Sequence, residues 1–297
     1  MKKVLITGVN GLIGSAVAEK LISHYEVIGT SIEQSNLTGL QIGYIQSDIT
    51  EKTTFKRLPQ KVDVIVHCAA VISRDNNSNL LLNTNCIGVQ NIAAYANEVD
   101  CHRVVYSSSL PVIGMPLIIP VTEEHPINPP TVYHITKYFG ELVLNKILGE
   151  KRVVIFRIPS PIGCRTAPNK IVPVFVKNAI ENLDYNLLGR GKRIQNYIDV
   201  RDIAIAVECA IEKSAYGVYN IASEKSYSNK ELAELCIKLF NSKSKIFYNG
   251  VDEEEDFKWV ISTEKAKKEL GFVAQYSLSD TLMEISKNYK HEDTLHK

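Results

Sequence analysis

The chain has 297 residues, of which 45% are hydrophobic and 23% are charged, and its formal net charge is +1. These values indicate an ordinary globular protein with one large domain, or a domain and a lobe, and give no sign of a strongly basic nucleic-acid binder. No apolar run approaches the roughly 18 residues of a membrane helix. No signal peptide is expected, so we predict a cytoplasmic protein with neither nucleic acid nor a membrane as its partner.

The chain opens with a strand, a glycine turn and a helix. Residues 4–6 form a short apolar run, residues 7–14 form the turn, and apolar residues recur at helical spacing over 16–22. In a dinucleotide-binding turn, the glycines allow a tight turn, remove a Cβ where the pyrophosphate approaches, and bring helix and strand together. The spacing G-x-x-G-x-x-G fits these roles, although such a trio also occurs in ordinary turns. The residues predicted to contact the cofactor here are Gly8, Asn10, Gly11, Leu12 and Ile13.

The second and third strands are expected over 25–31 and 41–46. The second strand of a dinucleotide fold normally ends in an acid that binds the adenosine ribose. Ser31 stands there instead, and Glu33 follows two residues later. No Arg or Lys stands near to receive a 2′-phosphate, so the choice between NAD and NADP stays open. After the third strand, Asp48–Ile49 is predicted to contact the cofactor, with a helix cap as an equal alternative for the carboxylate.

A fourth buried strand over 62–70 ends in small residues against which a nicotinamide ribose could lie: Cys68, Ala69 and Ala70. Residues 80–99 have the pattern of a half-buried helix that carries several polar side chains. Among these, Asn85 is predicted to face the cofactor. The fifth strand, 103–109, ends in three hydroxyl residues at the edge where ligands gather in open α/β sheets.

A proline-rich loop leads into a helix over 131–148, which carries Tyr133 and Lys137 on one face. A sixth strand follows over 153–158. Strands and helices alternate up to this point, which predicts an α/β fold with a Rossmann-type, doubly wound parallel sheet over residues 1–163.

After residue 163 the alternation loosens, and we expect 164–297 to form a smaller substrate-binding lobe. A strand near 217–222 is expected to return to the main sheet. The turn region 186–196 is rich in glycine and basic residues, whereas the acidic run 252–256 is expected to be a solvated loop. The six cysteines are scattered without a C-x-x-C motif, so we expect reduced thiols and no metal site.

Ser109, Tyr133 and Lys137 form the predicted catalytic group. A phenol is a poor base at neutral pH because its usual pKa is about 10. An ammonium one helical turn away, or a positively charged nicotinamide ring, would lower that pKa. We therefore interpret Tyr133 as the acid–base residue of a hydride transfer, with Ser109 orienting the substrate oxygen and Lys137 bonding the nicotinamide ribose. Each feature alone also occurs in elements with purely structural roles.

The ordered motifs resemble those of the extended short-chain dehydrogenases/reductases, specifically the NAD-dependent epimerase/dehydratase family. The resemblance covers nearly the whole chain. The matching segments are Thr7–Gly14, Asp48–Ile49, His67–Ala70, Asn85–Asn91, Tyr106–Ser109, Tyr133–Lys137, Arg157–Gly163, Asn196–Asp202, Tyr219–Ile221 and Lys265–Phe272.

The resemblance implies a nucleotide-sugar substrate. Its diphosphate is expected to meet a basic residue of the lobe, Arg193 or Arg190, with a solvated turn as the alternative. The resemblance also assigns Pro159 to the cofactor, and Ser160 together with Ser109 and Arg193 to the substrate. It further implies a homodimer formed through the helices expected over 80–99 and 131–148.

Two departures from the family pattern bear on the reaction. Sugar dehydratases of this family carry Asp-Glu directly after the catalytic serine, and Leu110–Pro111 stands there, which argues against a 4,6-dehydratase. A late phosphate-binding Arg is not obvious, because Asp256–Val260 contains only Lys258.

We therefore expect an NAD(P)-dependent epimerase or reductase that acts on a nucleotide sugar by hydride transfer at C4. A second interpretation, which the missing Arg favours, is an NAD(P)H-dependent reductase of a non-sugar ketone or aldehyde. A third is a dinucleotide-binding regulator without turnover, although such proteins usually lose the Tyr/Lys pair that this chain keeps.

Overall fold

The protein is described by a computed structural model over residues 1–73, 75 and 78–290, so the tail from His291, which the sequence predicts to fray, lies outside the described residues. Its centre is one parallel sheet of seven strands in the order β11-β6-β5-β4-β1-β2-β3. The strands are β1 (Lys3–Thr7), β2 (Glu26–Ser31), β3 (Gly43–Gln46), β4 (Val64–His67), β5 (Arg103–Ser109), β6 (Val153–Ile158) and β11 (Gly217–Asn220). This confirms the predicted Rossmann-type fold.

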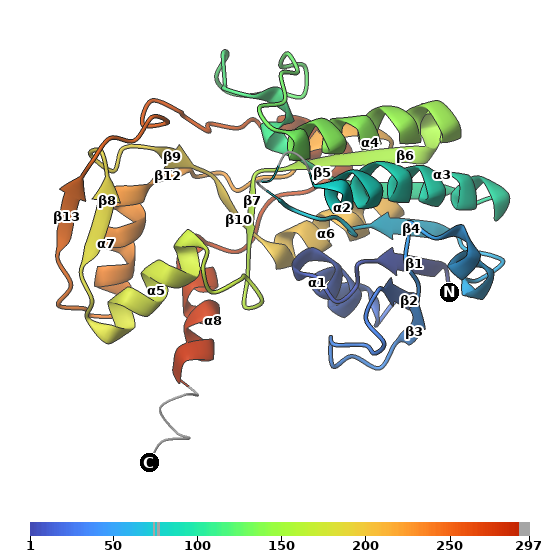
Figure 1. The fold of residues 1–297 in the computed structure, drawn as a ribbon, viewed down its shortest axis with the longest axis horizontal. Helices are drawn as coiled ribbons and strands as arrows, with labels where there is room; N and C mark the ends of the chain where they lie inside the picture. The colour runs from blue at the N-terminus through green and yellow to red at the C-terminus, as the bar shows by residue number, and fades with distance from the viewer. Residues whose placement is uncertain (74, 76–77, 291–297) are drawn as a thin grey trace.

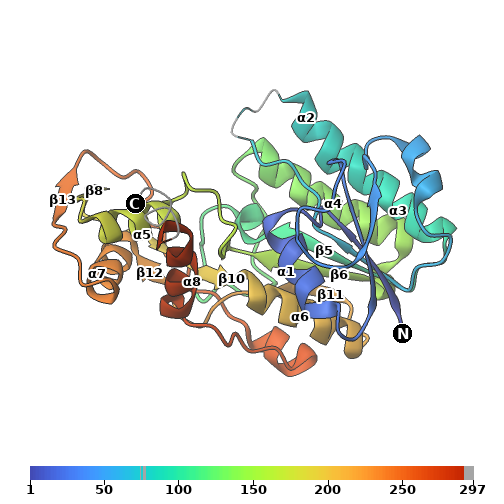
Figure 2. The same ribbon diagram turned by 90° about the horizontal axis from the view of Figure 1, so that it is seen from below.

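Helices cover both faces of the sheet, as the alternation of elements predicts (Figure 2). One face carries α1 (Leu12–Leu21) and α6 (Val200–Glu212), which pack against each other. The other face carries α3 (Val89–Glu98) and α4 (Val132–Leu148). The helix expected over 80–99 is continuous in space but changes its winding, from α2 (Asn79–Leu82) through a π-helical segment to α3.

The strands are apolar on both sides because each face is covered. All residues of β4 and β6 are buried, and β1 is buried beyond its first residue. Each of the two layers between sheet and helices has its own apolar core. Short 3₁₀ segments join some elements: η1 (Lys52–Arg57), η3 (Leu110–Ile113) and η4 (Glu150–Arg152).

A third apolar core lies in the lobe on the left of Figure 1. The π-helical turn η5 (Ala266–Leu270) belongs to the core beside the main sheet, whereas the helices of the lobe are α5 (Ile171–Glu181), α7 (Asn229–Leu239) and α8 (Leu278–Lys290). The strands of the lobe are β7 (Ser160–Ile162), β8 (Tyr185–Leu188), β9 (Ile194–Gln195), β10 (Tyr197–Asp199), β12 (Tyr227–Ser228) and β13 (Ile246–Asn249). They form two-stranded pairs, β10 with β7, β12 with β9, and β13 with β8.

The chain crosses between sheet and lobe more than once. After β10 it returns to the sheet with α6 and β11, and β11 pairs with β6, before it enters the lobe again. The division of the chain at residue 163 stays a prediction. Within the described residues, none of the helices has the length and apolar character needed to cross a membrane.

Candidate active site

The glycine turn lies between β1 and α1, at the carboxyl end of the sheet. Gly8 has φ +66°, and a Cβ on Gly14 would lie 2.3 Å from the Gly8 carbonyl oxygen, so neither position accepts a side chain without movement. Gly11 is the N-cap of α1, no side chain caps that helix, and its first turn has no acid. Free N–H groups and a partial positive charge therefore face outward, which fits a diphosphate.

A carboxylate, that of Glu33, lies just after the end of β2, two residues beyond Ser31, where an acid is normally found. The Ser31 hydroxyl donates to Glu33, and Asn10 Nδ2 donates to the same carboxylate at 3.2 Å. These bonds lower the pKa of Glu33. Asn10 also holds the following loop, through Leu37 N at 2.9 Å and Ser35 O at 3.0 Å. The Asn10 amide thus bonds to the chain itself, and Glu33, noted in the sequence two residues after Ser31, is the carboxylate at the end of β2.

The Asp48–Ile49 segment follows β3. Asp48 Oδ1 accepts from both the backbone N and the hydroxyl of Thr50 at 2.8 Å, so the carboxylate closes a turn with Thr50. It does not cap a helix, because η1 begins at Lys52 and its N-cap, Glu51, makes no side-chain capping bond. Asn91 Nδ2 donates to Ile49 O at 3.0 Å and fixes the segment to α3. A Cβ on Gly88 would lie 2.6 Å from the Ile49 side chain, which explains the glycine in this helix.

Cys68, Ala69 and Ala70 leave the end of β4 and pass close to the glycine turn. A Cβ on Gly8 would lie 2.7 Å from the Cα of Ala69. Asn85 holds the next residue, since its Oδ1 accepts from Val71 N at 2.8 Å and its Nδ2 donates to Val71 O at 2.9 Å and to Thr136 Oγ1 at 3.0 Å. Asn85 therefore fixes this segment to α4, a role that the sequence pattern does not distinguish from cofactor binding.

Lys137 lies almost completely buried on α4, with 3% of its surface exposed. Its Nζ stands 4.3 Å from the centre of the Tyr106 ring, a cation–π contact. Burial lowers the pKa of Lys137 to about 8, and the neighbouring Cys68 and Glu141 act in the opposite direction. A Cβ on Gly140 would lie 2.4 Å from the Tyr106 hydroxyl, so Gly140 lets α4 approach β5 closely.

Tyr133 lies in the first turn of α4 and is half-buried. Among the described residues its hydroxyl has no hydrogen-bond partner, while its ring contacts His134 edge-on at 5.0 Å. The expectation that Lys137 lowers the pKa of Tyr133 is wrong for the chain by itself, because burial raises that pKa to about 12. The chain supplies a protonated phenol, and any lowering has to come from a bound group.

Ser109 is the last residue of β5 and is buried. Its register partner on the adjacent strand is Ile158, so Pro159 and Ser160 follow directly beyond it at the same edge of the sheet. Ser160 begins β7, which leads into the lobe. The predicted catalytic serine and two predicted ligand-binding residues are therefore brought to one edge.

The basic turn of the lobe differs from expectation. Arg193 forms an ion pair with Glu254, and Arg190 pairs with Glu255 at 3.3 Å while its backbone N donates to the same carboxylate at 2.7 Å. The acidic run is a partly exposed turn, as expected, but two of its members, Glu254 and Glu255, are also the counterions of these arginines. Arg193 Nε is buried and has no hydrogen-bond partner among the described residues.

A polar group under α4 was not foreseen from the sequence. Thr7 Oγ1 and His67 Nδ1 are 2.7 Å apart, and the His67 ring stacks on Tyr106 at 5.6 Å. Burial lowers the pKa of His67 to about 3, so the ring is neutral. The only sequence signal was a polar residue at the end of two strands, Thr7 of β1 and His67 of β4.

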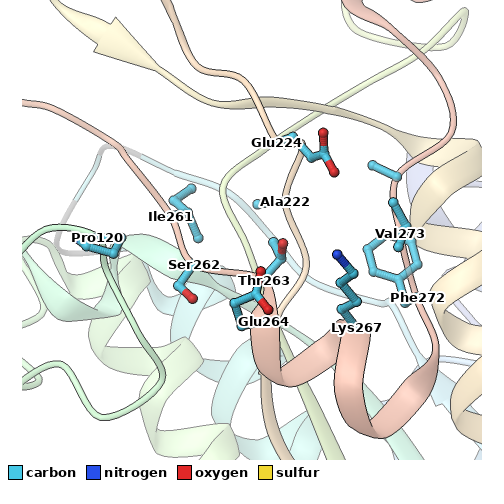
Figure 3. A pocket seen from close by; sticks show the side chains of 11 residues that line it. Pro120, Ala222, Glu224, Ile261, Ser262, Thr263, Glu264, Lys267, Phe272 and Val273 are labelled. Atoms are coloured by element: carbon cyan, nitrogen blue, oxygen red, sulfur yellow. The ribbon is translucent and has the colours of Figure 1, made fainter.

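A separate shallow pocket lies beyond the end of β11 (Figure 3). Its lining includes Glu224 and Lys267, whose charged ends face the same space, together with Ser262 and Thr263. None of the predicted catalytic or cofactor-binding residues is among those that line it.

The chain is similar in sequence and in structure to known proteins of one family. Residues 4–222 match the model of the NAD dependent epimerase/dehydratase family. The UDP-glucose 4-epimerase of Drosophila melanogaster is 27% identical over 298 residues, which cover 84% of this chain and 85% of that protein. A UDP-glucose 4-epimerase from Pisum sativum is 24% identical over 94% of this chain and 93% of its own length. The structure of Thermotoga maritima UDP-glucose 4-epimerase with UDP-glucose superposes with a TM-score of 0.87 at 23% identity, covering 98% of this chain and 99% of that one.

Proposed function

Because the chain belongs to the NAD-dependent epimerase/dehydratase family and is therefore an enzyme, we propose that it inverts one carbon, C4, of a nucleotide sugar. The observation that carries this proposal is the placement of Tyr133 and Lys137 on α4, which packs against β5 with Ser109 at its end, beside a glycine turn that fits a diphosphate. The epimerase names of the curated relatives support it. Leu110–Pro111 after Ser109 supports epimerisation over dehydration.

In this proposal, Tyr133 accepts the proton of the substrate hydroxyl and later returns it. Bound dinucleotide supplies the hydride acceptor, and its positive ring adds the charge that lowers the phenol pKa. Lys137, with a pKa near 8, adds a second positive charge and bonds the ribose. Ser109 donates a hydrogen bond to the substrate oxygen, and the buried setting excludes water from it.

For the cofactor, we infer a preference for NAD over NADP. Glu33 is held at the end of β2 by Ser31 and Asn10 and carries a lowered pKa, so it is ionised at neutral pH. A carboxylate accepts a hydrogen bond from the ribose 2′-hydroxyl of NAD, and its negative charge repels the 2′-phosphate of NADP. Arg165 reaches the neighbouring loop but donates to the Leu37 carbonyl. Equal affinity of the protein for NADH and NADPH by fluorescence titration would contradict this preference.

We also infer a cytoplasmic homodimer. The outer sides of α4 and of the helix beside it expose apolar side chains, among them Ile135, Phe139, Leu142, Leu80 and Ile87. Such a face on two adjacent helices suits a second copy of the chain. The six cysteines are free, which suits a reducing compartment. A monomeric mass by light scattering at working concentration would contradict the dimer.

The test of the proposed reaction is incubation of the purified protein with UDP-, GDP- and dTDP-sugars. We expect the C4 epimer to accumulate by NMR without a net change in absorbance at 340 nm. Net NADH consumption would instead identify a reductase. One observation favours the second candidate, a reductase of a non-sugar ketone: both lobe arginines are already neutralised by glutamates. Turnover of such ketones, but of no nucleotide sugar, would establish it.

A further inference from the structure

A buried ion pair lies one helical turn beyond Lys137. Arg157 on β6 and Glu141 on α4 form a two-pronged pair, with Nε to Oε1 at 3.2 Å and Nη2 to Oε2 at 2.8 Å. The side chains are only 6% and 3% exposed. Ser108 Oγ donates to Glu141 Oε1 at 2.6 Å. Oε1 thus accepts from groups on two strands and Oε2 from Arg157 alone, so both carboxylate oxygens are bonded, which keeps a buried charge in place.

The pair is part of a polar row that crosses three strands. Ser108 on β5 is the register partner of Arg157 on β6, and Arg157 is the register partner of Asn220 on β11. Arg157 Nη1 also donates to the Glu123 carbonyl at 3.2 Å, and the Glu123 carboxylate accepts from Asn220 N at 2.8 Å. The row therefore ties the loop that precedes α4 to the carboxyl ends of three strands.

Two members of this row, Glu141 and Ser108, are next to residues of the proposed site. Tyr133, Lys137 and Glu141 are spaced by four residues and share one face of α4. Ser108 directly precedes Ser109. Movement of Glu141 along or around the helix axis would move Tyr133 with it, because the helix between them is continuous.

We propose that Glu141 is a positioning residue, which with Ser108 and Arg157 sets the rotation and height of α4 on the sheet and so places Tyr133 and Lys137 against Ser109. The inference rests on the proposed function, since it assigns Glu141 a role in that reaction. Glu141 itself touches neither the substrate nor the reacting atoms; it acts through the residues of its own helix.

The charge of Glu141 also acts on Lys137. The titratable groups around Lys137 are His67 and Cys68 from β4, Tyr106 from β5, and Tyr133 and Glu141 from α4. At neutral pH His67 is neutral and burial raises the pKa of Cys68 to about 11, so Glu141 is the one anion of this set. Its charge favours the ammonium form of Lys137, against the effect of burial.

The test compares Glu141→Gln with Leu148→Ala. The first keeps the shape of the side chain and removes its charge. The second opens a cavity in the same helix, at the end remote from Tyr133, and controls for general loss of stability. For E141Q we expect kcat to fall about tenfold or more with KM within about threefold, since small misplacement of reacting groups has effects of this size. The alkaline limb of the kcat profile should move down by about one pH unit as Lys137 loses its proton more easily.

A second variant keeps the test decisive if E141Q folds poorly. Ser108→Ala removes one bond to Glu141 and leaves the ion pair, and we expect a smaller fall in kcat in the same direction. Hydrogen–deuterium exchange should become faster at amides 133–137 and 107–110 in S108A, whereas in L148A the change should stay near the C-terminal end of α4.

Two results would overturn the inference. One is kcat within twofold of the wild type in both S108A and E141Q. The other is an equal loss of kcat, with the same shift of the pH limb, in L148A. The exchange measurement needs no substrate. If the wild-type protein turns over no nucleotide sugar, the proposed function fails, while the exchange pattern still decides whether Glu141 and Ser108 hold the first turns of α4.

Discussion

Ion pairs in two regions of this molecule have similar chemistry and very different surroundings. Under α4, the guanidinium of Arg157 and the carboxylate of Glu141 are almost without solvent contact, at 6% and 3% exposure. In the lobe, Arg190 and Glu255 are 69% and 17% exposed, and Arg193 and Glu254 are 33% and 43% exposed. Buried charges cannot part without a large desolvation penalty, whereas exposed ones exchange readily with water and ions.

The difference separates two tasks. Under the proposed function the region under α4 keeps the reacting groups in one geometry, and a satisfied buried pair favours a single arrangement. Under the proposed function the lobe receives an anion that arrives and leaves, and a half-exposed arginine can change its partner. A substrate diphosphate that binds Arg193, as the family resemblance implies, would therefore have to displace Glu254 rather than meet a free cation.

The largest effect on turnover is expected in the region under α4, at the phenol of Tyr133. Replacing Tyr133 with Phe removes the acid–base group and leaves the ring. We expect kcat to fall by about 10²–10⁴-fold, the usual range for a general acid–base residue, with unchanged urea unfolding. Unchanged turnover in Y133F, measured by NMR of the sugar epimers, would remove Tyr133 from the mechanism.

Breaking the buried pair should greatly reduce stability. Arg157→Met leaves Glu141 charged and without its cation, so we expect the free energy of unfolding to fall by about 3–5 kcal/mol. Arg190→Met in the lobe is the matched control, and its cost should stay below about 1 kcal/mol. Equal shifts of the two urea midpoints would remove the distinction between the regions.

Asp202 offers an intermediate case, a buried acid whose own bonds go to backbone N–H groups. Its carboxylate accepts from Gln275 N at 2.8 Å and Tyr276 N at 3.2 Å, yet burial raises its pKa to about 6. The folded state thus binds this proton more tightly than the unfolded chain. The contribution of the group to stability is fully present below about pH 4 and is lost as the pH rises through 6.

Urea unfolding between pH 4 and 7 measures this loss, with Asp202→Asn as the reference that does not titrate. Relative to D202N, the wild type should lose up to about 3 kcal/mol across the window. A constant difference between the two proteins over that range would contradict the shifted pKa.

The smallest effect is expected in the lobe, at Glu254. Glu254→Gln frees Arg193 for an incoming anion, and we expect UDP to bind up to about fivefold more tightly by calorimetry, with the gain reduced at high salt. Glu253→Gln changes net charge equally at a neighbouring position and serves as the control. An identical gain in both variants would show that total charge, not the pairing, governs binding.

Local features of the sequence predicted most of the fold. The apolar runs of β1 and β4 and the glycine turn are determined by residues only a few positions apart. Their spacing in the sequence therefore indicates both the structure and its function. Gly14 shows this best, since its role as a contact between helix and strand is visible in the spacing alone. The same reasoning brought Ser109, Tyr133 and Lys137 to one end of the sheet; their catalytic and binding roles stay predictions.

Features that depend on distant partners were missed. The neutralisation of Arg193 needs Glu254, 61 positions later, and the acidic run gave no sign of its partner. The pKa of Tyr133 was expected to fall because spacing shows the nearby ammonium but not the burial that outweighs it. The bonds that Asn85 and Asn10 make to neighbouring segments were also not predicted, because an amide in a half-buried element looks the same in the sequence whether it binds a ligand or fixes a loop; their contact with the cofactor stays a prediction.

The return of the chain to the sheet with β11 has a consequence for attempts to shorten this protein. A polypeptide cut after residue 163 would lose α6, which covers α1, and β11, which covers the edge of β6. Its remaining strands would present an open apolar margin to other copies and invite aggregation. Shorter versions of this enzyme should therefore be made by trimming surface turns within the lobe. The main sheet and its helix layer are complete only with α6 and β11, which come after residue 163 in the sequence.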